Sequence, residues 1–200
     1  PWVAWLALVG TLAIAGLPPL NGFVSEWLLL QAFLFTPGLP QSFVNMLVPI
    51  AAAALANKEG ALDDAVVILA GDAPGRDAYR EELIGLIARH GLDDKVRLVG
   101  HCREMPAAYL AAQVAVTTST VPETFGRTSV EAQAMGCPVI VPDLGAPPET
   151  ILAASPGAAS FTGWLTPPRN IEELAGSIRQ ALALDPEQRA EIGARARAHV

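Results

Sequence analysis

The charged side chains are distributed so unevenly that they divide the sequence into two parts. Glu26 is the only charged residue before Lys58, whereas Lys58–Val200 carries every other Lys, Arg, Asp and Glu. A stretch with a single charge has almost nothing from which to form a solvated face. The sequence therefore predicts a hydrophobic membrane-type helical segment at 1–56 and a folded domain at 57–200.

The first part contains three apolar runs that prolines separate. A helix that crosses a membrane needs about 20 apolar residues, and prolines stop or break helices. The pattern therefore predicts transmembrane-type helices, with a very hydrophobic soluble core as the alternative. The three runs are Trp2–Gly16, Phe23–Phe35 and Phe43–Ala56.

One stretch of the first part resembles a known membrane family. The string GLPPLNGFVSEWLLLQAFL, residues 16–34, is similar to the antiporter-like membrane subunits of formate hydrogenlyase and hydrogenase-4 complexes. The resemblance implies broken transmembrane helices along an ion path, with Glu26 as a buried ionisable group on that path. Intramembrane carboxylates are functional candidates because burying an unpaired charge is costly. The family subunit has many more helices than this segment can form, so the segment alone cannot complete a proton path.

The second part alternates short apolar runs with segments of helical spacing. Short connections between strands and helices indicate βαβ units with right-handed crossovers. The pattern predicts a Rossmann-like α/β domain with a parallel sheet. The predicted strands are 64–71, 95–99, 114–117 and 138–141, and the predicted helices are 76–90, 106–112, 127–135, 148–154, 171–182 and 186–199.

Two carboxylates flank the start of one predicted helix. Glu123 lies in the loop after the third strand and Glu131 follows eight residues later on the helix. Open parallel sheets bind ligands beyond the carboxyl ends of their strands, and helix N-termini attract phosphate. The pair suits a nucleotide diphosphate sugar, because carboxylates accept hydrogen bonds from hydroxyls. A solvated loop glutamate beside a helix-start glutamate is the alternative that spacing alone leaves open.

The sequence around this pair resembles the group 1 retaining glycosyltransferases of GT-B fold. The matching stretch is PETFGRTSVEAQAMGCPVIVPDLGAPPE, residues 122–149, with an E-x7-E pattern and Phe-Gly after its first glutamate. The resemblance extends over about 60–200 and implies the C-terminal, donor-binding half of the fold. It implies that Glu123 is catalytic and that Glu131 binds the donor ribose. It also implies donor pyrophosphate contacts from the segment that contains Phe125, Gly126, Arg127 and Thr128, with the Arg127 side chain as a secondary candidate.

Parts of the family pattern have no counterpart in this sequence. The N-terminal acceptor-binding domain is missing, as are the Arg and Lys that neutralise the pyrophosphate in the family. Thr118 stands where Pro is common, and Gly145-Ala146 stands where two glycines are usual. The chain also starts without Met and ends inside a helical pattern. We therefore expect a fragment whose isolated form has no transferase activity.

Composition limits the partners that the chain can have. The formal net charge is −7 and the basic residues are scattered, which argues against nucleic acid. Cys102 and Cys137 have no Cys or His neighbours at zinc-ligand spacing, so we expect reduced thiols and no metal site. The expected ligand is a nucleotide sugar, bound as substrate without a cofactor. We expect a membrane-associated protein whose soluble domain is cytoplasmic.

Three functional interpretations follow from these patterns. The first is a retaining glycosyltransferase that contributes only its donor-binding half. The second is a fragment of a proton-translocating membrane subunit that uses Glu26. The third is an accidental join of two gene fragments, since the two patterns meet near Ala56 without a linker.

Overall fold

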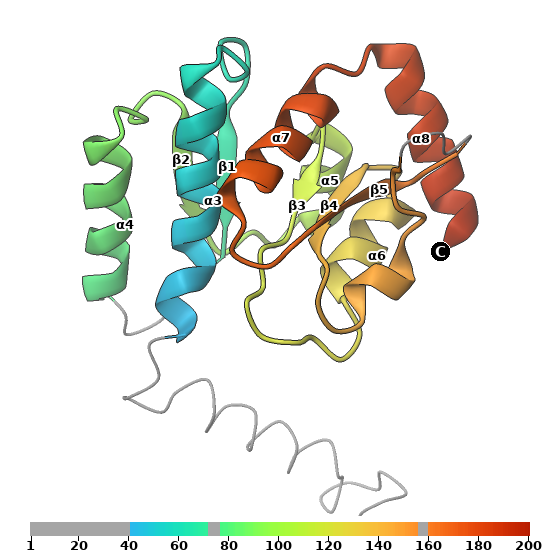
Figure 1. The fold of residues 1–200 in the computed structure, drawn as a ribbon, viewed down its shortest axis with the longest axis horizontal. Helices are drawn as coiled ribbons and strands as arrows, with labels where there is room; N and C mark the ends of the chain where they lie inside the picture. Colours follow the sequence, from blue (N-terminus) through green and yellow to red (C-terminus); the bar gives the residue numbers. More distant parts are fainter. Residues whose placement is uncertain (1–40, 72–76, 156–159) are drawn as a thin grey trace, which may run out of the picture. The chain divides into compact units, whose positions relative to one another are not determined.

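The computed structural model describes residues 41–71, 77–155 and 160–200, and side chains from Pro49 onward (Figure 1). Residues Phe43–Val200 form one compact unit. The two predicted apolar runs before residue 40, together with Glu26, lie outside the described residues.

The unit alternates strands and helices along the chain (Figure 1). Every strand is short, as expected for strands of a buried parallel sheet. The elements are α3 (Gln41–Lys58), β1 (Val67–Ala70), α4 (Asp77–Arg89), β2 (Val96–Gly100), α5 (Met105–Ala111), β3 (Ala115–Val116), α6 (Arg127–Ala134), β4 (Val139–Pro142), the 3₁₀ helix η1 (Pro147–Thr150), β5 (Gly163–Thr166), α7 (Ile171–Leu182) and α8 (Pro186–His199).

The strands pair in parallel, which confirms the predicted α/β parallel architecture. They form two sheets among the described residues, with the orders β2-β1 and β3-β4-β5. A doubly wound sheet has six strands in the order 3-2-1-4-5-6. In that comparison β1 and β2 correspond to its strands 2 and 3, and β3, β4 and β5 correspond to its strands 4, 5 and 6. No strand of the described residues corresponds to its strand 1.

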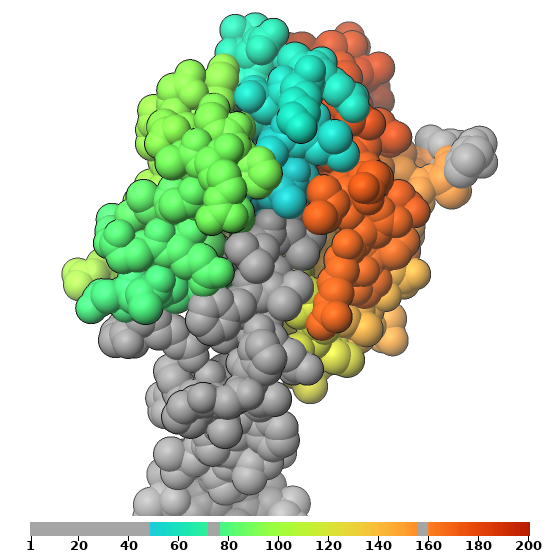
Figure 2. All heavy atoms as spheres, turned by 60° about the vertical axis from the view of Figure 1, so that its left-hand side comes forward, coloured from blue at the N-terminus to red at the C-terminus, as the bar shows by residue number. Residues whose placement is uncertain are grey.

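Helix α3 packs against the cores of both sheets. Its Ala52 and Ala56 are fully buried in a cluster with Ile140 of β4 and Trp164 of β5. Its Ile50, Ala53 and Ala54 belong to a second cluster, with Leu83 of α4 and Val96 of β2. Figure 2 shows the atoms of α3 that follow residue 48, in cyan, between the green atoms of α4 and the orange-red atoms of α7. Alanine suits this place because its small side chain lets the helix approach both neighbours closely.

This packing changes how the third apolar run, Phe43–Ala56, is understood. Composition assigns it to the membrane-type segment 1–56, but the run forms most of α3. Its buried residues lie in the α/β core: Ile50, Ala52, Ala53, Ala54 and Ala56. None of the helices in the described part of the chain is long and apolar enough to cross a membrane. The boundary that the charges indicate near residue 57 therefore lies inside α3 and does not separate two structural units. The helix carries few charges because it is buried on two sides.

Two elements differ from those that the sequence predicts. The helix predicted at 148–154 is the short 3₁₀ helix η1 followed by an extended segment that bridges β5 at Ala153 and Gly163. Strand β5 has no counterpart among the predicted strands. A Cβ at Gly163 would lie 2.3 Å from the carbonyl oxygen of Val139, so only glycine lets β5 approach β4 this closely. The extended conformation of β5 therefore comes from its pairing with β4 and not from the local strand propensity of its residues.

Candidate functional site

The loops that follow β3 and β4 are joined at Glu123. Its backbone bridges Gly145, and its carbonyl oxygen accepts a hydrogen bond of 2.9 Å from the Ala146 N–H. Gly145 has a φ of +69°, and a Cβ there would lie 2.6 Å from the Glu123 carbonyl oxygen. Both the positive φ and the lack of space for a Cβ therefore require glycine at position 145. The bridge holds Glu123 at the carboxyl ends of β3 and β4, where a parallel sheet binds its ligands.

The Glu123 side chain is held by a neighbour in the same loop. The Ser119 hydroxyl donates a hydrogen bond to Glu123 Oε1, and both residues are half-buried. A hydroxyl that donates to a carboxylate fixes the direction of that carboxylate. The second oxygen of the carboxylate can still accept hydrogen bonds from a ligand hydroxyl.

Gly126 starts helix α6 in a left-handed conformation, with φ 71° and ψ 42°. A Cβ there would lie 3.3 Å from Pro147 and 3.2 Å from the Ser129 hydroxyl, so the turn fits closely against η1. No side chain caps the helix, and Arg127 and Thr128 are exposed. Their backbone N–H groups lie in the first turn of α6, at the positive end of the helix dipole, where anions bind.

A buried polar network fixes α6 against η1. The Ser129 hydroxyl lies 2.7 Å from the Thr150 hydroxyl, and the fully buried Gln133 donates from Nε2 to the carbonyl oxygens of Thr150 at 2.8 Å and Ser129 at 3.2 Å. Buried networks of this kind hold one arrangement of the backbone. The network therefore fixes the position of α6 relative to η1.

Glu131 forms an ion pair with Arg127 on the outer face of α6. Arg127 Nη2 and Glu131 Oε1 are 3.0 Å apart, and the two side chains are 80% and 46% exposed. A solvent-exposed pair one helical turn apart contributes only about 0.3–0.5 kcal/mol to stability. A ligand can therefore separate the two groups at little cost. Phe125, which is 61% exposed, adds an accessible aromatic ring to the same end of the helix.

The groups beneath α6 are neutral at physiological pH. Burial, followed by the negative charge of Glu131, raises the pKa of Tyr109 above its usual value of 10.0. Burial also raises the pKa of the Cys137 thiol to about 11. Both cysteines are free thiols, with Cys137 buried and Cys102 half-buried. The layer under the site therefore adds no charge that would oppose an anionic ligand.

The structure brings the predicted residues Glu123, Phe125, Gly126, Arg127, Thr128 and Glu131 onto one loop and the helix that follows it. His101 and Arg103, which follow β2, are exposed on the loop that leads to α5. Arg76 lies outside the described residues.

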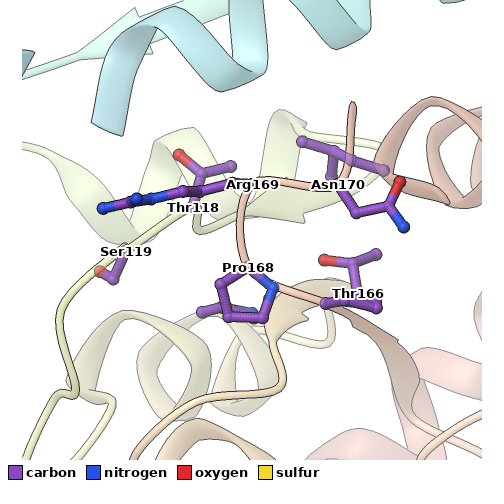
Figure 3. A pocket seen from close by; sticks show the side chains of 9 residues that line it. Thr118, Ser119, Thr166, Pro168, Arg169 and Asn170 are labelled. Carbon is purple, nitrogen blue, oxygen red and sulfur yellow. The ribbon is translucent and has the colours of Figure 1, made fainter. Parts of the chain in front are cut away.

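Sequence reasoning missed two residues at this rim. Ser119 lies in the predicted loop, but nothing in its spacing indicates that it bonds to Glu123. Arg169 follows β5 in a Pro-Pro-Arg-Asn turn and has a φ of +65°. It lines a pocket together with Thr118, Ser119 and Thr166 (Figure 3). Prolines signal a turn, but the sign of φ at an arginine cannot be inferred from them.

Comparison with known proteins gives a consistent picture for the α/β unit. A family model described as "Glycosyl transferases group 1" matches residues 46–199. A D-inositol 3-phosphate glycosyltransferase of Kineococcus radiotolerans is 33% identical over 135 residues, which are 66% of this chain and 31% of that protein. The chain thus spans about a third of that relative's length.

A solved structure and a second kind of relative complete the comparison. The crystal structure of Anabaena Alr3699/HepE in complex with UDP and glucose is similar with a TM-score of 0.60 and 32% identity, over 74% of this chain and 38% of that one. Hydrogenase-4 component B of Escherichia coli is 41% identical over 56 residues, which are 28% of this chain and 8% of that protein.

Proposed function

The chain belongs to the group 1 glycosyl transferases, and on this premise we propose that its α/β unit is the donor-binding half of a retaining glycosyltransferase that takes a nucleotide diphosphate sugar. One observation carries the proposal. Glu123 precedes the uncapped N-terminus of α6 and Glu131 follows it on the helix, and Glu123 is half-buried while Glu131 is exposed. Carboxylates beside a phosphate-binding helix end match the hydroxyls and the diphosphate of such a donor.

Each group has a distinct role in the proposal. Glu123, oriented by Ser119, accepts hydrogen bonds from hydroxyls of the donor sugar and orients its anomeric carbon. When the bond between that carbon and the diphosphate breaks, negative charge grows on the leaving phosphate. The N–H groups of Arg127 and Thr128 and the dipole of α6 stabilise that charge.

Ligand binding would rearrange the ion pair on α6. Glu131 accepts hydrogen bonds from the ribose hydroxyls, so it exchanges its contact with Arg127 for contacts with the nucleoside. The Arg127 guanidinium is then released next to the diphosphate. Because the exposed pair is weak, the exchange needs little free energy.

The acceptor half of the enzyme is not part of the described unit. We propose that a separate N-terminal GT-B domain supplies the acceptor site, so that the unit alone binds a donor without transferring its sugar. The similar proteins support a glycosyl donor, since one is a complex with UDP and glucose and another is a D-inositol 3-phosphate glycosyltransferase. Titration with UDP, GDP and ADP identifies the nucleotide base of the donor.

A second candidate function rests on the similarity to Hydrogenase-4 component B. In this second candidate function, residues 1–42 associate with a membrane and Glu26 lies on an ion path. The α/β unit faces the cytoplasm. A join of two gene fragments would produce the same two similarities without a shared function. Proton flux into vesicles containing the chain, lost in Glu26→Gln, would favour the ion path. Because the segment cannot complete a proton path alone, we expect equal flux with and without the chain.

The donor proposal is tested by calorimetric titration of UDP, GDP and ADP into the full 200-residue chain. We expect saturable binding of one nucleotide, weakened about tenfold or more in Glu131→Ala because the ribose contacts are lost. The matched control is Glu81→Ala, which removes an exposed carboxylate from α4. Absence of binding by all three nucleotides would refute the proposal.

A further inference from the structure

A pocket lies beside the Ser119–Glu123 pair, at the carboxyl ends of three strands. It is lined by Thr118 and Ser119 after β3, Pro142 at the end of β4, and residues from Thr166 to Asn170 after β5. Ser119 also donates to Glu123, so the pocket adjoins the proposed catalytic carboxylate. Nothing in the proposed function uses this pocket.

Arg169 is the only charged residue that lines the pocket. In Figure 3 its side chain extends from the β5–α7 loop toward the side where Thr118 and Ser119 lie. The guanidinium is exposed and has no hydrogen bond or ion pair in the described part of the chain. The neighbouring Asn170 is already engaged, since its side chain caps α7 by accepting from the Glu173 N–H at 3.1 Å.

The backbone of Arg169 is strained. With a φ of +65°, it is the only residue other than glycine with a positive φ among those that the structure describes. A side chain in this region crowds its own backbone, and such strain often occurs where function demands a particular residue. Glycine would fit this turn without strain, so the arginine is not explained by the fold.

We propose that Arg169 forms a subsite for a phosphoryl group next to Glu123. A planar guanidinium presents donors that match phosphate oxygens. The hydroxyls of Ser119 and Thr166 are already engaged, with the Glu123 carboxylate and the Val141 carbonyl oxygen. The subsite supplies the unit with a cation where the Arg and Lys of the family pattern have no counterpart. The inference rests on the proposed function for its connection to the donor, whereas the phosphoryl subsite itself stands on the pocket.

The experiment compares wild type with Arg169→Gly in the full chain, by titration with UDP, uridine and inorganic phosphate and by thermal unfolding. We expect UDP and phosphate to bind about tenfold more weakly to the variant, while any affinity for uridine stays the same. The melting temperature of the unliganded variant should rise by about 2–4 °C because glycine relieves the strain. A residue with a purely structural role would not give opposite signs for stability and binding.

Two further variants make the result specific. Arg169→Lys keeps the charge and should retain part of the affinity, whereas Arg80→Ala removes an exposed arginine from α4 and should bind as wild type does. Unchanged binding of both UDP and phosphate to Arg169→Gly overturns the subsite, even if Glu131→Ala shows that the nucleotide site works. Loss of phosphate binding in a chain that binds no nucleotide supports the subsite and refutes the donor proposal.

Discussion

The carbonyl oxygen of Glu123 lies so close to Gly145 that a Cβ at position 145 would approach it to 2.6 Å. This contact connects the loop that carries the proposed catalytic carboxylate to the loop after β4. The position of the carboxylate thus depends on a residue with no side chain.

Gly145→Ala should displace Glu123 and destabilise the unit. The substitution combines a positive φ, which costs about 1–2 kcal/mol, with an overlap against backbone that cannot easily move. We expect a loss of about 2–4 kcal/mol in the free energy of unfolding, measured by urea denaturation. Gly91→Ala is the matched control, because Gly91 has a φ of +64° with nothing within 4 Å of an added Cβ. Equal losses in the two variants would contradict the role of the contact.

Ser119→Ala should leave the Glu123 side chain free to rotate. The hydroxyl donates to the carboxylate that is proposed to bind the sugar hydroxyls, so the affinity for the nucleotide part of the donor should not depend on it. We expect a drop of about five- to tenfold in affinity for the nucleotide sugar relative to the nucleoside diphosphate, by competitive titration. Ser119→Thr keeps the hydroxyl and should restore the ratio. A parallel loss for both ligands would indicate a general disturbance of the loop.

Gln133→Leu should destabilise the unit without touching any ligand. Gln133 is fully buried and donates to two carbonyl oxygens, which the leucine would leave without these bonds. Such losses cost about 1–3 kcal/mol. The free energy of unfolding should fall accordingly, and Gln113→Leu, at an exposed position between α5 and β3, should change it less. An unchanged stability would show that the network does not hold α6.

The stability of the unit should fall in alkali partly through Cys137. Burial raises the pKa of this thiol from 9.0 to about 11, so the unfolded chain loses this proton before the folded chain does. The contribution is complete below pH 9 and is lost as pH rises toward about 11, with a slope of about 1.4 kcal/mol per pH unit. Cys137→Ala should flatten the stability profile in this range, measured by denaturation at several pH values. The same slope in the variant would exclude the thiol as its cause.

Much of the architecture could be predicted because parallel strands and amphipathic helices leave strong local patterns. The amphipathic face of Ile171–Leu182 becomes α7, with Leu174 and Ile178 buried. Strand β5 was missed because Gly163 and Trp164 take their conformation from packing against β4 and α3, which a local pattern does not contain. The residues of the E-x7-E pattern could be named from the sequence, but the roles of Ser119 and Arg169 depend on where the loops meet.

Helix α3 connects the two sheets of the unit, because its residues pack into the hydrophobic clusters of both. Strands β1 and β3 each pair with one neighbour among the described residues, so the backbone hydrogen bonds of the sheets stop along a seam in the middle of the unit. Among the described residues, α3 contributes buried alanines to the clusters on both sides of that seam. The apolar side chains of Val66 and Ile68, beside it, are 55% and 63% exposed. The unit should therefore open first along its own centre, with α3 as the hinge, and not by fraying from its outer strands.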